Sequence, residues 1–209
     1  MDDGGVGNAL VRVRELYTES LHDHGNDSRS VGWKTRESQL LRFEKLAVAL
    51  DGIDGPLTVN DWGCGYGAMF GFLAERLGDR LAAYAGYDIS DDMIAAAREA
   101  VTDPRATFHL GDEPAEADVT FVSGTFNVRF DADADAWREW IESRLRQLTA
   151  VSRRALAFNL LSTYVDWQEP HLYYGDPRAF FDFCKRHLSP RVALLHDYEL
   201  YEWTIVVRR

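Results

Sequence analysis

Residues 58–73 read TVNDWGCGYGAMFGFL, an apolar run that is interrupted by glycines at positions 63, 65 and 67 and then resumes. Asp61 stands two positions before the first of these glycines. Glycine adopts backbone dihedrals that other residues avoid, and it lets a ligand approach the main chain closely. The stretch is therefore compatible with a phosphate site, a nucleoside site or a tight structural turn, and the surrounding sequence has to distinguish them.

From residue 57 onward, short apolar segments alternate with helical patterns. Strands are predicted at 57–62, 84–89, 106–110, 118–124, 155–161, 191–196 and 202–208. The helices predicted among them cover 68–78, 91–101, 135–152 and 177–186. This alternation is typical of an α/β fold with a doubly wound, mainly parallel seven-stranded sheet. Only DYELY separates the last two strands, which is too short for a crossover helix, so a C-terminal antiparallel strand hairpin is expected.

Two amphipathic helices are predicted ahead of the first strand, at 8–22 and 36–50. The segment between them, HDHGNDSRSVGW, is rich in turn-forming residues and is predicted as a loop that includes His22-Asp23-His24. We therefore expect a single domain over 1–209. Residues 1–55 would form an N-terminal helical extension or lid, and 56–209 the α/β core.

The charge balance argues against polyanionic partners. The chain has 23 Lys and Arg against 34 Asp and Glu, a net charge of −11, and its densest basic stretches are only pairs of arginines. Such a surface repels nucleic acid. Two distant cysteines without metal-ligand spacing favour a reduced, cytoplasmic setting and no metal site. No signal peptide or membrane span is indicated, so no membrane partner is expected.

The glycine loop fits two ligand classes. GCGYGA matches the dinucleotide fingerprint G-x-G-x-x-A and also a G-x-G-x-G pattern, and Asp88 supplies the acidic residue that both expect after the second strand. The Asp61 carboxylate would disfavour a pyrophosphate at this loop, but it could accept hydrogen bonds from a ligand's ammonium group. The chain also has no length left for a dehydrogenase substrate domain. The loop by itself leaves open an NAD(P)-dependent oxidoreductase and a non-catalytic nucleoside-binding module.

Over residues 56–207 the chain resembles the class I S-adenosylmethionine-dependent methyltransferases. The stretches that carry the resemblance are VNDWGCGYG, YAGYDISDDMIAAAREA, FHLGDE and ADVTFVSGTFN, together with the final hairpin. The resemblance implies that S-adenosylmethionine is the cofactor and that its methyl group is transferred to an oxygen or nitrogen atom of a small-molecule acceptor.

The resemblance also implies roles for individual residues. Gly63, Gly65 and Gly67 would lie under the methionine part of the cofactor, and Asp61 would hold its amino group. Asp88 would accept both ribose hydroxyls. The remaining roles are an adenine sandwich by Ile89 and Met93, a bond from the adenine amino group to Asp112, and room for the reacting groups at Ser123 and Gly124. For most of these residues a core, loop or helix-capping role is the alternative.

Two segments outside these motifs supply further candidates. Arg42 can offer a bidentate cation for the cofactor's carboxylate, with Trp33 in the loop before it; a surface arginine and a core tryptophan are the alternative. His171 and Tyr174 follow the fifth strand, where a histidine can remove a proton from an acceptor. The aromatic-rich loop 162–176 around them is typical of a small, partly apolar ligand site, unless it only packs onto the sheet.

Overall fold

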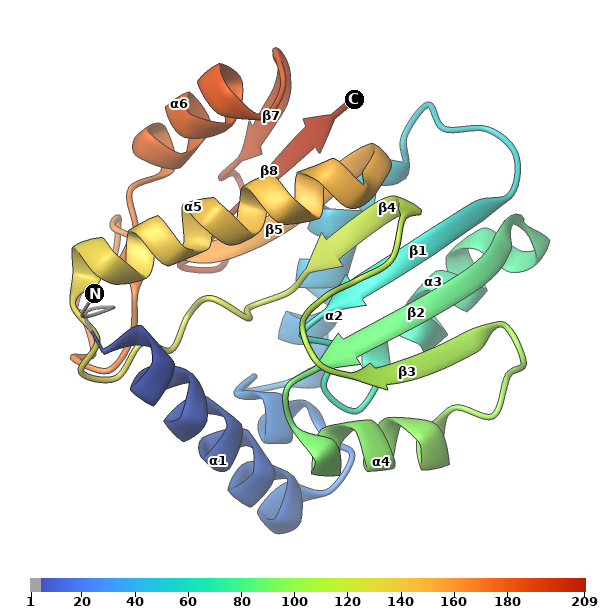
Figure 1. The fold of residues 1–209 in the computed structure, drawn as a ribbon, viewed down its shortest axis with the longest axis horizontal. Coiled ribbons are helices and arrows are strands. Elements are labelled where there is room, and N and C mark those ends of the chain that lie inside the picture. The colour runs from blue at the N-terminus through green and yellow to red at the C-terminus, as the bar shows by residue number, and fades with distance from the viewer. Residues whose placement is uncertain (1–4) are drawn as a thin grey trace.

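The computed structural model describes residues 5–209, so the first four residues of the predicted extension lie outside it. Its centre is an eight-stranded sheet in which seven strands follow the order β3-β2-β1-β4-β5-β8-β7 and β6 pairs with β5 off this path (Figure 1). The strands are β1 (Leu57–Trp62), β2 (Leu81–Asp88), β3 (Ala106–Leu110), β4 (Ala117–Val122), β5 (Ser152–Ser162), β6 (Tyr174–Gly175), β7 (Arg191–Leu195) and β8 (Glu202–Arg208). The helices are α1 (Val6–His24), α2 (Arg36–Leu46), α3 (Ala68–Leu77), α4 (Asp91–Ala100), α5 (Ala134–Val151) and α6 (Pro177–His187), with 3₁₀ turns η1 (Ser28–Val31), η2 (Ala47–Leu50) and η3 (Gly78–Arg80).

The strand directions confirm the predicted fold class. β1, β2, β3, β4 and β5 pair in parallel, whereas β8 runs antiparallel to both β5 and β7. The chain moves outward from β1 to β3 on one side and from β4 to β5 on the other. The strand order therefore reverses between β1 and β4, and ligands of doubly wound sheets bind beyond the carboxyl ends of the strands at such a point. The two-residue β6 was not predicted, because two residues show no periodicity.

Helices cover both faces of the sheet. One core cluster places Phe43 of α2, Leu73 of α3 and Ile94 of α4 against the central strands. The other places Ile141 of α5 and Phe183 of α6 on the opposite face. Figure 1 shows α5 crossing the front of the sheet, with α2 and α3 behind it. This two-sided cover explains why the central strands β1 and β4 are buried along almost their whole length.

The N-terminal segment divides into two parts. α2 belongs to the packed layers, because Phe43 and Leu46 are buried in the core. α1 lies outside the sheet layers and contacts α4 and α5 (Figure 1). It extends to His24 and ends where the Gly25 N–H bonds the carbonyl of Leu21, so His22-Asp23-His24 forms its last turn and not the predicted loop. Within the predicted extension over 1–55, α1 and α2 therefore pack differently.

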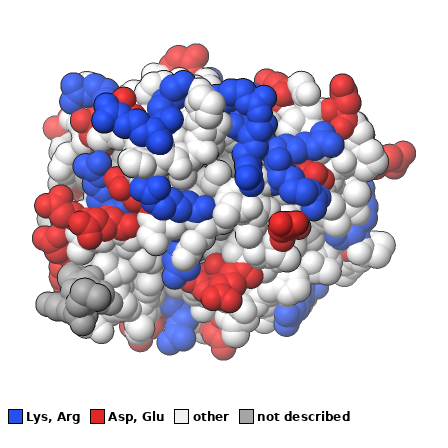
Figure 2. Space-filling model, turned by 45° about the horizontal axis from the view of Figure 1, so that its top comes forward, with Lys and Arg blue, Asp and Glu red and all other residues white. Residues whose placement is uncertain are grey.

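Several properties of residues 5–209 bear on the partners and ligands that the sequence analysis considered. No helix within residues 5–209 has both the length and the apolar character needed to cross a lipid bilayer. Over the same range, metal-ligating side chains do not gather in groups of three or more. Cys64 and Cys184 are buried and unpaired. On the face that Figure 2 shows, Lys and Arg side chains gather mainly in the upper half, with Asp and Glu side chains among them.

Candidate active site

The glycine loop makes a tight turn from β1 into α3. Gly63, Gly65 and Gly67 have φ values of 79°, 52° and 82°, a region that strains other residues. Neighbouring side chains also leave no room for a Cβ atom, which on Gly63 would lie 2.2 Å from Thr125 Oγ1 and on Gly65 2.8 Å from Val31 Cγ1. The turn alone therefore accounts for all three glycines. Gly63 and Gly65 nevertheless line a pocket at the switch point, whereas Gly67 only begins α3.

Asp88 lies at the end of β2, at the edge of this pocket. One carboxylate oxygen accepts the Gly65 N–H at 2.9 Å, and the other accepts the Ser90 N–H at 2.9 Å. Burial raises the pKa of Asp88 although these N–H bonds oppose the rise. The Ser90 hydroxyl caps α4 by accepting the Met93 N–H, so Asp88 is free of that task. Each carboxylate oxygen keeps a lone pair for a ligand.

The pocket is built from the strand ends and from α1. The predicted cofactor residues that line it are Trp33, Gly63, Gly65, Asp88, Ile89, Met93, Asp112, Ser123 and Gly124. The Asp112 carboxylate pairs with Arg144 at 3.0 Å, and its carbonyl accepts the indole N–H of Trp62. Four lining residues that we did not predict come from α1: Leu10, Val13, Arg14 and Tyr17. The predicted lid over 1–55 did not single out these residues of α1.

Asp61 lies beside this pocket, in a smaller cavity. It is 2% exposed, and its carboxylate accepts the Tyr84 hydroxyl at 2.5 Å. Burial raises the pKa of Asp61 to about 7, with the nearby Asp88 carboxylate adding to the rise. Ser123 lines both cavities, and its hydroxyl is the one buried side-chain oxygen or nitrogen within residues 5–209 that has no hydrogen-bond partner. Such an atom is suited to a polar ligand group.

The raised pKa of Asp61 predicts a pH-dependent stability. The ordinary value is 3.8 and the folded value about 7, so between these values the folded protein holds a proton that the unfolded chain has released. The free energy of unfolding contributed by this site should therefore fall as the pH rises through that window. Asp61→Asn removes the titration, so its stability relative to wild type should increase with pH. Urea unfolding of both proteins without ligand, between about pH 4.5 and 7.5, measures this difference; a constant difference would contradict it.

Arg42 does not line the pocket, contrary to our prediction. Its Nε and Nη2 donate to the Glu202 carboxylate at 2.6–3.0 Å, and Nη1 donates to the Ser38 carbonyl at 2.7 Å. The guanidinium carbon lies 3.7 Å from the centroid of the Trp33 ring. Because the guanidinium is engaged in these bonds, we do not retain Arg42 as a ligand of the cofactor's carboxylate. Glu202, which binds this guanidinium, is 160 positions away from Arg42 in the sequence.

A second, larger cavity of about 930 Å³ adjoins the first, and Trp33 and Gly124 border both. A Cβ on Gly124 would lie 2.4 Å from the Trp33 ring, so the indole rests directly on this glycine. His171 and Tyr174 line the large cavity as well. The Tyr174 hydroxyl accepts the backbone N–H of Glu169 at 2.9 Å, which braces the loop after β5. His171 is exposed and lies against Phe130.

Known proteins match this chain both in sequence and in fold. A family profile described as "Methyltransferase domain" matches residues 59–157. Rv1506c of Mycobacterium tuberculosis, named as a methyltransferase, is 45% identical over 158 residues that cover 74% of this chain and 94% of the relative. N-demethylindolmycin N-methyltransferase of Streptomyces griseus is 27% identical over 165 residues, covering 77% of this chain and 68% of that protein.

A solved structure extends the match to the whole fold. Magnesium protoporphyrin IX methyltransferase of Synechocystis, with bound S-adenosylhomocysteine, superposes with a TM-score of 0.66 at 14% identity, covering 98% of this chain and 97% of that one.

A doubly wound sheet with a reversed last strand, carrying a glycine turn and a carboxylate at its switch point, defines a nucleoside-binding α/β enzyme. With the sequence relatives, the assignment becomes specific: the chain belongs to the class I S-adenosylmethionine-dependent methyltransferases. It is an enzyme, and its cofactor is S-adenosylmethionine. This assignment decides against the two alternatives left open by the sequence, a nicotinamide-dependent oxidoreductase and a non-catalytic module.

Proposed function

We propose that the enzyme methylates an oxygen or nitrogen atom of a small molecule that binds in the large cavity. The observation that carries this proposal is the cavity itself, whose volume of about 930 Å³ adjoins the cofactor pocket at Trp33 and Gly124. Small-molecule sites usually measure roughly 300–1,000 Å³ and are mostly apolar. The name of the Streptomyces griseus relative, N-demethylindolmycin N-methyltransferase, supports a nitrogen acceptor in a small molecule.

We assign the cofactor to the first pocket together with the small cavity beside it that holds Asp61. In our proposal Asp88 receives the two ribose hydroxyls on the free lone pairs of its carboxylate. Asp61 and the unpartnered Ser123 hydroxyl receive the polar groups of the methionine part. Ile89 and Met93 enclose the adenine, and the Asp112 carboxylate, steered by Arg144, faces its amino group.

Catalysis in this proposal is mainly alignment. S-adenosylmethionine supplies a methyl group activated by its sulfonium, and the protein's task is to hold the acceptor atom in line with it. Trp33 and Gly124 border both cavities, so they limit where the acceptor atom can lie. Tyr17 also borders both; burial raises its pKa to about 12, which suits it to donating a hydrogen bond and not to accepting a proton. We assign proton removal to His171.

Substitutions in the large cavity test the acceptor site. Tyr174→Ala removes an aromatic wall and should raise the KM for the acceptor about tenfold, while His171→Ala should lower kcat by about a hundredfold. S-adenosylhomocysteine affinity should stay close to wild type in both variants, because neither side chain lines the cofactor pocket. Tyr174→Phe is the matched control, because it keeps the aromatic ring in the cavity and loses only the hydrogen bond to the Glu169 N–H. Full turnover by both alanine variants would mean that the loop 162–176 takes no part in binding the acceptor.

The function itself is tested by radiolabelled methyl transfer. Wild-type enzyme is incubated with methyl-labelled S-adenosylmethionine and a library of small amines and hydroxyl compounds, with tRNA and a protein extract as separate arms. We expect label in a small molecule. Labelling of tRNA or protein in preference to every small acceptor would overturn the proposal.

A further inference from the structure

The mouth of the large cavity carries exposed aromatic side chains. Six large apolar side chains within residues 5–209 are exposed, and three of them, Leu16, Trp167 and Tyr201, line this cavity. Trp167 is 60% exposed and Tyr201 49%. Single exposed apolar residues are ordinary, but several gathered at the mouth of a ligand cavity indicate a surface that a ligand covers.

Trp167 and Tyr201 form an ordered pair. Their ring centroids lie 6.1 Å apart at an interplanar angle of 70°, a favourable edge-to-face geometry. The Tyr201 hydroxyl donates to the Asp166 carboxylate, which joins the loop after β5 to the segment before β8. Tyr164 is on the same loop and equally exposed at 59%, but it packs on His196 and does not line the cavity. Trp167 and Tyr201 therefore differ from Tyr164 in lining the cavity.

The charges of the cavity lining restrict what this pair can contact. Arg42 and Glu202 bind each other and contribute no net charge. The other charged lining residues are the exposed Glu169, Glu199 and Lys34. Two carboxylates against one ammonium disfavour an anionic ligand at the mouth. The tryptophan and tyrosine faces themselves attract cationic groups as well as other rings.

We infer that the acceptor carries a planar ring system, neutral or cationic, at some distance from the atom that is methylated. This ring rests on Trp167 and Tyr201 at the mouth, while the methylated atom reaches inward to Trp33 and the cofactor pocket. The inference rests on the proposed function, because it assigns a substrate class to the same cavity. It makes Trp167 and Tyr201 residues that select the acceptor without taking part in the chemistry.

Binding of three probes tests the inference. Affinities of 2-(1-naphthyl)ethylamine, hexylamine and 1-naphthaleneacetate are measured by calorimetry with saturating S-adenosylhomocysteine. The naphthyl amine should bind about tenfold more tightly than either of the others, because only it offers both the ring and the favoured charge. Trp167→Leu and Tyr201→Leu keep apolar bulk but remove the planar faces, and each should weaken the naphthyl amine about tenfold.

Tyr164→Leu is the matched control, and it should leave all three affinities unchanged. Equal binding of the naphthyl amine and hexylamine to wild type, or an equal effect of Tyr164→Leu and Trp167→Leu, would overturn the inference. The acceptor library separates this failure from failure of the function. Methylation of ring-free small molecules, unaffected by Trp167→Leu, would overturn the ring preference and keep the function. Methylation of tRNA or protein alone would overturn both.

Discussion

Asp88→Ala is expected to weaken S-adenosylhomocysteine binding by about a hundredfold or more. Hydrogen bonds to a charged acceptor are each worth about 1.5–3 kcal/mol, and the proposed ribose contact contains two of them. The substitution also removes the acceptor of the Gly65 N–H, so the glycine turn keeps only its backbone bonds from Gly63 and Cys64 to the Tyr87 carbonyl of β2. Loss of a direct ligand contact and loosening of the pocket wall therefore act in the same direction.

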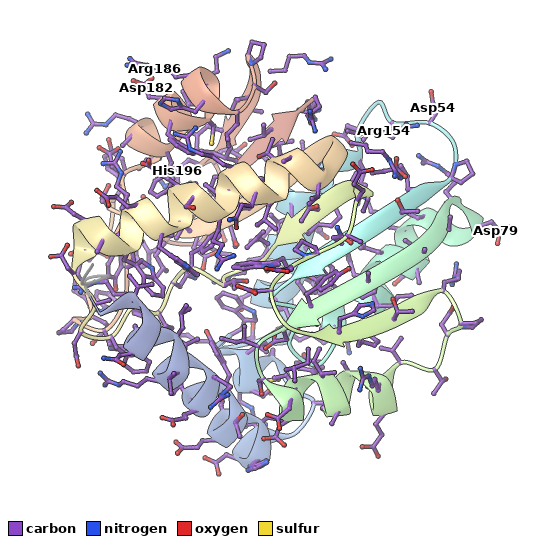
Figure 3. All side chains as sticks on the ribbon, viewed as in Figure 1. Asp54, Asp79, Arg154, Asp182, Arg186 and His196 are labelled. Carbon is purple, nitrogen blue, oxygen red and sulfur yellow. The ribbon has the colours of Figure 1, made fainter. Side chains whose placement is uncertain are left out.

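Isothermal titration of wild type, Asp88→Ala and Asp88→Asn with S-adenosylhomocysteine measures the effect. Asn keeps the size and one oxygen acceptor, so its affinity should lie between the other two. Asp79→Ala is the control for loss of a carboxylate, because Asp79 points outward at the edge of the molecule in Figure 3 and lies outside the pocket. An Asp88→Ala protein that is folded and binds with wild-type affinity would remove Asp88 from the cofactor site.

The fold could be predicted because its signals are local. Each predicted strand and helix is present, since the period of apolar residues changes clearly between the two kinds of element. The glycine turn and Asp88 are local signals too, because they lie at the ends of the first and second strands. Most predicted cofactor residues line one pocket for the same reason: parallel strands all end at the same edge of the sheet.

What the sequence did not determine depended on distant partners. Arg42 stood near the right segment, but nothing around it in the sequence indicates that Glu202 would occupy its guanidinium. The apolar face of α1 was visible as a pattern, whereas its position over the pocket follows from contacts with α4 and α5. In both cases the local pattern gave the kind of side chain correctly and left its partner undetermined.

Breaking the buried ion pair between Arg42 and Glu202 should lower the free energy of unfolding by about 3–5 kcal/mol. The two side chains are only 9% and 1% exposed. Asn159 Nδ2 donates to Glu202 at 2.8 Å, and Asn159 Oδ1 accepts the Gly124 N–H at 2.7 Å. The pair is thus linked by hydrogen bonds to the glycine that supports Trp33. Arg42→Met leaves an unpaired buried carboxylate, and Glu202→Met leaves an unpaired buried guanidinium.

A double-mutant cycle distinguishes a coupled pair from two independent contributions. If each single variant suffers mainly from the charge left behind, Arg42→Met with Glu202→Met should be no less stable than either single variant. Urea unfolding measures all four proteins. Arg186 and Asp182, an exposed pair on α6 (Figure 3), give the matched control, whose loss should be about 0.5 kcal/mol or less. Additive losses at Arg42 and Glu202, or a loss as small as at Arg186, would mean that the two side chains do not act as a coupled buried pair. A coupled result would mean that Arg42, on which the Trp33 ring stacks at the border of the two cavities, depends on Glu202 to compensate its buried charge.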